Sequence, residues 1–183
     1  LSVPLGVWAA VRARKIDGLA LNAVGQLGIA VPSFLIGIAL IATLSGHFEL
    51  PSQGFPRQGW GDDFWRAARS LVLPSLALAA ALTSVLLRFT RAAILDVLNQ
   101  DYIRTARAKG LSRTRALFVH GLRNASIPVI AVLGVQIASL IAGVVVIESV
   151  FNLPGVGRML IDDIGSRDFD KVQGTVLLMS AMV

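Results

Sequence analysis

Cysteine is absent from this chain of 183 residues, and charged residues make up only 15% of it. Without cysteine the chain has no disulfide and no thiolate metal site, although this absence does not identify the cellular compartment. A soluble domain carries about 25% charged residues, whereas 55% of this chain is hydrophobic. The composition therefore favours a membrane protein over a soluble one.

The sequence also lacks the short motifs of common catalytic sites. It contains no G-x-x-x-x-G-K-[ST] phosphate loop, no G-x-S-x-G elbow and no H-E-x-x-H zinc motif. No pair of ionisable residues lies inside the apolar runs, as a membrane-embedded enzyme would require. We therefore expect a protein that is not an enzyme, does not hydrolyse ATP itself and holds no metal or other cofactor.

Long uncharged runs are the main feature that is present. A spanning helix needs about 20 apolar residues, and the uncharged runs 19–44 and 125–147 meet this requirement. The uncharged run 71–87 is shorter, but it suffices for a span over 71–92 because Arg88 can snorkel to the membrane surface. Residues 1–11 read as the end of a span and residues 172–183 as the start of another. The sequence therefore predicts an all-α polytopic membrane protein, of which this chain is a piece.

The distribution of charge predicts which connecting segments face the cytoplasm. Residues 93–124 and the cluster at 12–15 are basic, whereas 45–70 and 148–171 contain most of the acids. Counted with the neighbouring Asp17, Arg88 and Arg91, the inner side holds 11 Lys/Arg and 3 acids, whereas the outer segments hold 6 Lys/Arg and 8 acids. This bias follows the positive-inside rule. It also places His47 outside and His120 inside, so the two histidines cannot share a metal ion.

Two local features add detail to this layout. Pro32 lies within the run 19–44, where a missing backbone donor should kink one continuous helix. Trp60, Phe64 and Trp65 are aromatics of the kind that favour a membrane–water interface. They predict an external loop that ends in a short interfacial helix near residues 62–69.

The most basic stretch, residues 101–128, has six Lys/Arg against the single acid Asp101. A short helix is predicted over 100–109, with Asp101 in its first turn where the helix dipole favours an anion. Gly110 is placed for the left-handed residue that ends a helix in a Schellman motif. Ser112 is placed to cap a second helix that runs to about Leu122.

The first of these helices has a small apolar face made by Tyr102, Ile103 and Ala106, whereas Arg104 and Arg107 stay in water. Such a face suits a groove on a partner protein. Resting on anionic lipid headgroups explains the same composition equally well. A DNA-binding helix-turn-helix has a similar length, but the flanking spans argue against it.

The run DYIRTARAKGLS, followed by HGLRNASIP, resembles the cytoplasmic loop of binding-protein-dependent ABC importer permeases, above all the dipeptide/oligopeptide and nickel branch. The general motif of that family is Glu-Ala-Ala, three residues and Gly. Here Arg104-Thr105-Ala106 stands where Glu-Ala-Ala would, Gly110 matches the glycine, and the later proline is displaced to Pro128, as in the peptide branch. The outer stretch ESVFNLPGVGRML, with RDFDKVQG after it, is similar to the B-type peptide permease subunit.

The resemblance implies a type I ABC permease bundle in a prokaryotic cell membrane. It implies a coupling helix that sits in a groove on a cytoplasmic ATPase subunit, which binds the ATP. The contact residues that it implies are Asp101, Tyr102, Thr105, Ala106, Lys109 and Gly110. Further partners would be a second permease subunit, an external solute-binding protein and membrane lipid, but not nucleic acid.

Three polar residues inside the runs, Asn22, Gln26 and Gln136, are candidates for a translocation path. Polar residues in spans also serve helix packing, where each hydrogen bond is worth about 0.6 kcal/mol. Glu148 ends a span, where it is expected to be hydrated. Pro154, Gly155 and Gly157 read as a turn.

The cargo stays open at this point. Dipeptides, longer peptides, nickel complexes and glutathione-like solutes all fit the resemblance. A membrane protein with a purely structural or lipid-contacting role is the alternative outside transport.

Overall fold

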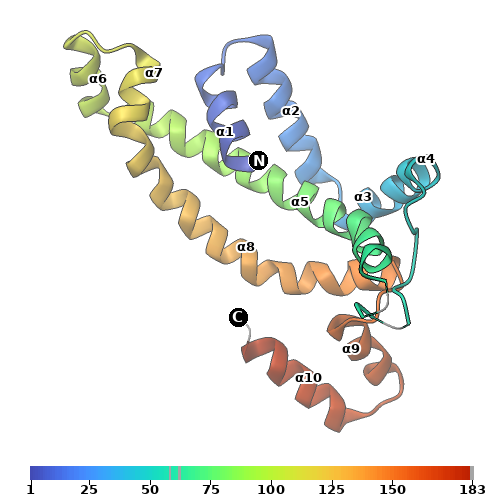
Figure 1. Ribbon diagram of the computed structural model, residues 1–183. Coiled ribbons are helices and arrows are strands. Elements are labelled where there is room, and N and C mark those ends of the chain that lie inside the picture. The colour runs from blue at the N-terminus through green and yellow to red at the C-terminus, as the bar shows by residue number, and fades with distance from the viewer. Residues whose placement is uncertain (58, 62, 182–183) are drawn as a thin grey trace. The chain divides into compact units, whose positions relative to one another are not determined.

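The computed structural model describes residues 1–57, 59–61 and 63–181, and within these residues every regular element is helical (Figure 1). The chain forms two units that interleave along the sequence. The first consists of Leu1–Ala30 and Ala81–Gln136, and the second of Val31–Ala80 and Ile137–Val183. The prediction of an all-α protein is confirmed.

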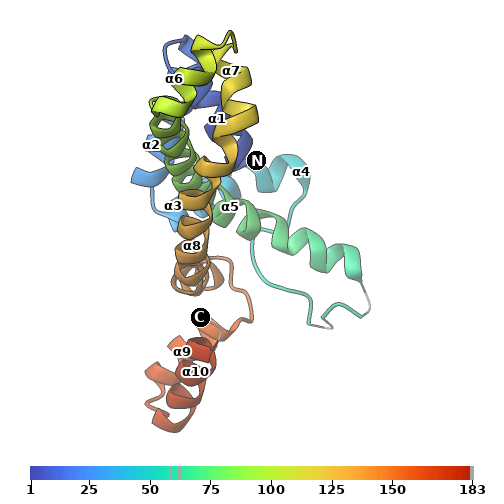
Figure 2. The same cartoon turned by 90° about the vertical axis from the view of Figure 1, so that its left-hand side faces the viewer.

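The first unit begins with α1 (Ser2–Val11) and α2 (Ile16–Ala30), which pack against one another. It continues with the later part of α5 (Phe64–Leu98), α6 (Asp101–Ala108) and α7 (Arg113–Ala116). The π-helical segment η2 (Leu117–Gly121) and the beginning of α8 (Leu122–Val150) complete it. Figures 1 and 2 both show α6 beside α7.

The core of the first unit lies where α5, α6, η2 and α8 meet. Ile94, Ile103 and Leu117 are among its fully buried side chains. Gly121 allows this meeting, because a Cβ there would lie 2.9 Å from Val97 Cγ1. Gly6 on α1 likewise lets that helix approach α5, since its Cβ would lie 2.6 Å from Thr90 Cβ. Small residues thus set the distance between helices, as they do in membrane proteins generally.

The second unit contains α3 (Ser33–Leu40), the π-helical segment η1 (Ile41–Ser45) and the single-turn α4 (Gly46–Phe48). It also holds the first half of α5, the end of α8, α9 (Val156–Gly165) and α10 (Phe169–Ala181). Its core is formed by Leu73, Ala77, Ile147, Phe151 and Leu153. Helices α9 and α10 lie side by side as a hairpin in both views (Figures 1 and 2).

The run 19–44 is not one kinked helix, so that prediction is wrong. Helix α2 ends at Ala30 and α3 begins at Ser33, with Pro32 as an extended N-cap at φ −58° and ψ 143°. Proline disfavours the α conformation in the residue before it, and its own nitrogen donates nothing to the helix. Here these effects break the helix instead of bending it.

The separate interfacial helix expected near residues 62–69 is also absent from the part of that range that the structure describes, which excludes Asp62. Phe64 instead opens α5, which continues to Leu98 and so contains the whole predicted run 71–92. The carboxylate of Asp63 accepts a hydrogen bond from the Arg66 backbone N–H at 3.0 Å, as an N-cap residue does. Phe64 and Trp65 therefore lie in the first turn of a long helix, whereas Trp60 lies in the turn before it.

The second helix of the basic stretch does not end near Leu122. It passes from α7 through η2 into α8 and ends at Val150, so the predicted span 125–147 is part of a longer helical rod. Among the described residues, the helical stretches Phe64–Leu98 and Arg113–Ile141 are long and apolar enough to cross a membrane. The interrupted pair Ile16–Ala30 and Ser33–Phe48 qualifies if its two helices form one span.

Candidate functional site

Helix α6 carries most of the residues that the sequence selects. Gln100 is its extended N-cap residue, and Asp101 occupies the first turn as predicted. The Asp101 carboxylate pairs with Arg104 at 3.3 Å on the exposed surface, and its carbonyl accepts a hydrogen bond from Thr105 Oγ1 at 2.9 Å. This helix of eight residues is therefore held in part by its own side chains.

The apolar face of α6 is not free to dock, contrary to the prediction. Ile103 is completely buried and Ala106 is 8% exposed, and both belong to the core of the first unit. Their spacing of three residues places them on one face of the helix, which packs against Val97 and Leu117. Only Tyr102 of the three predicted face residues remains open, at 39% exposure.

The turn after α6 has the predicted geometry. Gly110 has φ +93°, and its N–H donates to the Arg107 carbonyl at 2.9 Å. The Leu111 N–H donates to the Ala106 carbonyl at 3.3 Å, which completes a Schellman motif. Ser112 Oγ then accepts a hydrogen bond from the Arg115 N–H at 3.3 Å. The glycine ending and the serine cap are both confirmed.

One contact between α6 and α8 was not foreseen. Asn124 Nδ2 donates a hydrogen bond to the Tyr102 hydroxyl at 3.0 Å. The two residues lie 22 positions apart, and neither periodicity nor a motif in the sequence links them. Together with the buried Ile103, this bond attaches the short helix to the beginning of a long one.

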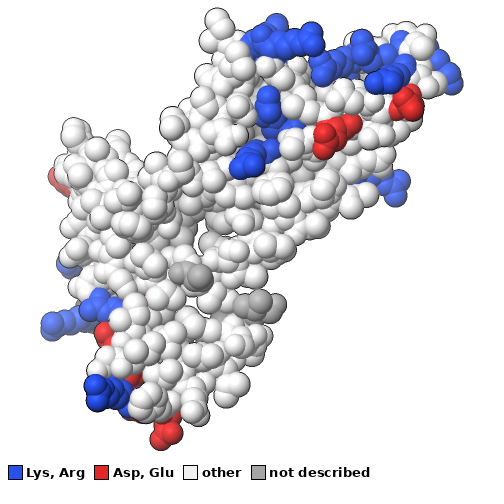
Figure 3. All heavy atoms as spheres, turned by 180° about the vertical axis from the view of Figure 1, so that it is seen from behind, with Lys and Arg blue, Asp and Glu red and all other residues white. Residues whose placement is uncertain are grey.

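The outer surface of this region is strongly basic. Figure 3 shows Lys and Arg side chains gathered over α6, α7 and the turn between α1 and α2. The exposed members of this cluster are Arg14, Lys15, Arg104, Arg107, Lys109, Arg113, Arg115 and Arg123. Asp101, Tyr102, Thr105, Lys109 and Gly110 are all exposed on α6 and its turn, whereas Ala106 is not.

The predicted path residues are dispersed. Asn22 and Gln26 lie one turn apart on α2, where Asn22 is half-buried and Gln26 is exposed. Gln136 is half-buried on α8. Their part in a translocation path stays a prediction.

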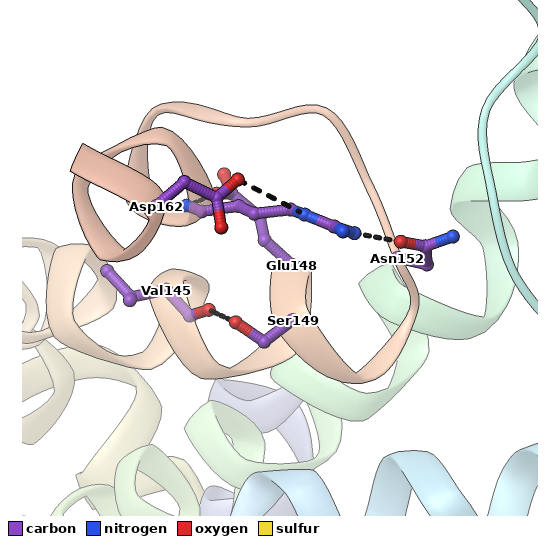
Figure 4. A network of polar contacts seen from close by, with 6 residues as sticks. Val145, Glu148, Ser149, Asn152 and Asp162 are labelled. Atoms are coloured by element: carbon purple, nitrogen blue, oxygen red, sulfur yellow. Dashed lines mark hydrogen bonds and ion pairs between the residues drawn. The ribbon is translucent and has the colours of Figure 1, made fainter. Parts of the chain in front are cut away.

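The predicted outer motif forms a compact polar cluster at the start of α9 (Figure 4). A Glu148 carboxylate oxygen accepts a hydrogen bond from the Arg158 N–H at 2.9 Å, so it caps the amino end of α9 from another helix. Gly155 leaves room for this carboxylate, because a Cβ at that position would overlap it and force the Glu148 side chain to move. This capping role, in which the half-buried carboxylate of Glu148 bonds to the backbone of α9, was not foreseen from the sequence.

Further contacts hold this cluster to the end of α8. The Arg158 guanidinium donates to Asn152 Oδ1 and lies 3.9 Å from an Asp162 oxygen. Asn152 adopts a left-handed conformation, φ +53°, in a second Schellman ending. Gly157 is buried, and its Cβ would lie 2.7 Å from Val145 Cα.

The turn predicted over 154–157 is therefore shorter than expected. Pro154 and Gly155 precede α9, but Gly157 is already the second residue of that helix. Gly157 serves the close contact between α9 and α8 and not a change of direction.

The link from α9 to α10 carries an ion pair, Asp168 and Lys171, in which both pKa values are shifted. Hydrogen bonds from Lys171 lower the pKa of the Asp168 carboxyl. The hydrogen bond to Asp168 in turn raises the pKa of the Lys171 ammonium group. Their charged atoms lie 2.7 Å apart. Among the described residues no group of three His, Cys, Asp or Glu side chains gathers as a metal site would require.

In a comparison with known proteins, this sequence matches over residues 2–183 the family described as binding-protein-dependent transport system inner membrane component. It is 38% identical over 205 aligned residues to the dipeptide transport system permease protein DppB of Escherichia coli (strain K12), covering 100% of this chain and 60% of the relative. It is 44% identical over 180 residues to the glutathione transport system permease protein GsiC of the same strain, covering 96% of this chain and 54% of the relative. The chain thus spans little more than half the length of these relatives.

Proposed function

This chain belongs to the family of binding-protein-dependent transport system inner membrane components, and on that premise we propose that it is a permease subunit of an ATP-driven importer. It forms half of a translocation pore, which a second permease subunit completes. It receives its driving force from cytoplasmic ATPase subunits, and an external solute-binding protein delivers the cargo.

The observation that carries this proposal is the way α6 is mounted. One face is anchored in the core through Ile103 and Ala106, and the opposite face presents Asp101, Thr105 and Lys109 to solvent. A short helix fixed to longer helices by its buried face can transmit a push applied to its free face. The coupling contacts are accordingly Asp101, Tyr102, Thr105, Lys109 and Gly110. Ala106 supports them from inside.

The proposed orientation places the basic end of the first unit in the cytoplasm. Residues 93–124 and 12–15 are inside, and 45–70 and 148–171 are outside. Counted with Arg88 and Arg91 at the inner end of the preceding span, the Lys/Arg excess of 11 to 6 supports this arrangement through the positive-inside rule. In this orientation the Glu148 cluster faces outward, where it holds α9 ready for a binding protein.

We propose peptides as the cargo, with dipeptides first. The names of the two relatives point to dipeptide and to glutathione, which is itself a small peptide-like solute. A nickel complex is the second candidate, because the sequence motifs of the basic loop are shared with that branch. Asn22, Gln26 and Gln136 are the residues proposed to line the path.

The test uses the full-length protein in proteoliposomes with its ATPase subunits, partner permease and binding protein. ATP-dependent uptake of a labelled dipeptide is measured, with glutathione and a nickel complex as competitors. We expect the dipeptide to be accumulated only when ATP is enclosed with the ATPase. A non-transport role for the chain would leave no ATP-dependent uptake of any of the three solutes.

The matched variants are Thr105→Trp and Val119→Trp. Both positions are exposed in the first unit, but only Thr105 lies on the proposed contact face. Thr105→Trp is expected to lower retention of the ATPase and uptake about tenfold, the effect of losing about 1.4 kcal/mol of binding. Val119→Trp should keep both near the unmodified level. Full activity of Thr105→Trp would remove the coupling role from α6.

A further inference from the structure

An apolar groove of about 490 Å³ opens on the first unit between α1 and the rod formed by α7, η2 and α8. This volume is within the range of ligand pockets, about 300–1,000 Å³. Val3, Trp8 and Phe118 on its walls are 40%, 50% and 57% exposed, so the residues that the structure describes do not fill it. The lining residues are Val3, Pro4, Val7, Trp8, Val11, Arg12, Thr114, Phe118 and Leu122.

The groove has one polar end. All its lining residues are apolar except Arg12 and Thr114, which close the two walls where α1 ends and α7 begins. From Arg12 back to Val3, and from Thr114 on to Leu122, each wall is about 12–14 Å long at 1.5 Å per residue. Half the hydrocarbon thickness of a bilayer is about 15 Å. The groove therefore matches the depth of one leaflet, with its polar end at the surface.

The residues at the polar end suit the headgroup region. The Trp8 indole N–H donates to Asp17 at 3.2 Å, and an indole with a polar partner is typical of the membrane interface. The Arg12 guanidinium lies 4.6 Å from the centre of the Trp8 ring and 2.7 Å from the Asp17 carboxylate. Asp17 is thus neutralised by Arg12.

The remaining charges around this end are positive. Arg14 and Lys15 follow Arg12 in the turn after α1, and Arg113 and Arg115 flank Thr114. All four are exposed, and Figure 3 shows the Lys and Arg side chains of this region gathered with little acidic charge among them. Each Lys or Arg near a membrane surface attracts anionic lipid. The rim therefore complements a negative headgroup.

We propose that this groove is a binding site for one anionic phospholipid of the leaflet on the basic side of the membrane. One acyl chain lies along Val3, Val7, Phe118 and Leu122, and the phosphate meets the Thr114 hydroxyl among the surrounding cations. The proposal requires that the chain lies in a membrane, and it does not depend on the transport role.

The first test titrates the full-length protein in detergent with phosphatidylglycerol or phosphatidylcholine of identical acyl chains and counts retained lipids by native mass spectrometry. We expect phosphatidylglycerol to be retained preferentially. Thr114→Glu places a carboxylate at the rim, in the first turn of α7 where the helix dipole tolerates it. It should lower phosphatidylglycerol retention about fivefold, the effect of one surface charge, and leave phosphatidylcholine unchanged.

Gln100→Glu is the matched control, because it adds the same charge at an exposed position outside the groove. Its retention of phosphatidylglycerol should equal that of the unmodified protein. Val3→Trp, at an exposed wall position, should lower retention of both lipids by filling the groove. Unfolding temperatures of the variants verify that each one is folded.

A photoreactive residue in place of Phe118 supplies a second readout, and we expect it to mark phospholipid in membranes. The proposal fails if the unmodified protein retains both lipids equally, or if Thr114→Glu and Val3→Trp retain phosphatidylglycerol normally. It also fails if the crosslink forms only to protein, because a helix of this chain or of a partner would then occupy the groove. Peptide uptake is measured separately, so the two proposals can fail independently.

Discussion

Gly110 is the residue on which the conformation of the basic loop depends most directly. Its φ of +93° is left-handed, and among the described residues no heavy atom beyond Gly110 and its two chain neighbours lies within 4 Å of where a Cβ would be. Gly110→Ala would therefore meet no clash and would cost backbone strain alone, about 1–2 kcal/mol. We expect thermal unfolding of the purified protein to occur at a lower temperature.

Gly134→Ala is the control for this substitution. A Cβ at Gly134 also meets open space, but the residue lies in the regular helix α8. Alanine is a better helix former than glycine by about 1 kcal/mol, so this variant should be as stable as the unmodified protein or more so. An equal fall in unfolding temperature for both variants would show that the left-handed conformation of Gly110 is not the cause of the lost stability.

At Gly155 the effect of a side chain comes from the lack of space around the residue, not from its backbone conformation. A side chain there displaces the Glu148 carboxylate from the amino end of α9. Loss of a capping side chain at a helix amino end costs about 0.5–2 kcal/mol, so Gly155→Ala should loosen α9. Hydrogen exchange of the α9 amides is expected to become faster, whereas Gly165→Ala in the same helix, where a Cβ meets nothing, should not change it. Unchanged exchange in Gly155→Ala would refute the capping role of Glu148.

Residue type predicted conformation well only where its effect is local. Gly110 and Ser112 act on groups within a few residues of themselves, so composition and spacing were enough. Asn152 and Arg167 also adopt left-handed conformations, at φ +53° and +58°. Neither was predicted, because residues other than glycine seldom adopt this conformation and their presence in a sequence does not indicate it. The burial of Ala106 depends on distant side chains and left no local sign.

Among the elements, α6 is the one whose attachment decides how force would pass through the first unit. Its only side-chain hydrogen bond to α8 among the described residues runs from Asn124 to the Tyr102 hydroxyl. Tyr102→Phe removes the acceptor and should weaken the attachment by about 0.5–1.5 kcal/mol. We expect less peptide to be taken up per ATP hydrolysed.

A double-mutant cycle separates this bond from other effects. Tyr102→Phe, Asn124→Ala and the double variant should show strongly non-additive losses, because either single change already removes the hydrogen bond. Additive losses of uptake per ATP would mean that the two side chains act independently.

Helix boundaries were the weakest part of the sequence-based prediction. The existence of apolar helices followed from uncharged runs, but Pro32 broke a helix where a kink was expected, and Pro74 and Pro128 lie inside helices that continue. Proline thus interrupts the helical run at one position and is accommodated inside a continuous helix at two others. Which outcome occurs depends on packing that periodicity does not describe.

For the whole molecule, the sequence motifs identified the family correctly, and the family model matches residues 2–183. The sidedness of the loops is a prediction that introduced cysteines test, because these 183 residues contribute no thiol of their own. Single variants Thr105→Cys and Ser52→Cys, both at exposed positions, should react with a membrane-impermeant maleimide from opposite sides. Thr105→Cys is expected to react only in inverted vesicles, and labelling of both from one side would contradict the layout.

The central claim is that α6 receives the driving force from a cytoplasmic ATPase, and cross-linking tests it most directly. The full-length Thr105→Cys variant is treated with a short thiol-to-amine cross-linker in membranes that contain its ATPase subunits, with Ser52→Cys as the control. The account predicts a permease–ATPase adduct from Thr105→Cys and none from Ser52→Cys. No adduct from Thr105→Cys, while the ATPase still co-purifies with the permease, would contradict it.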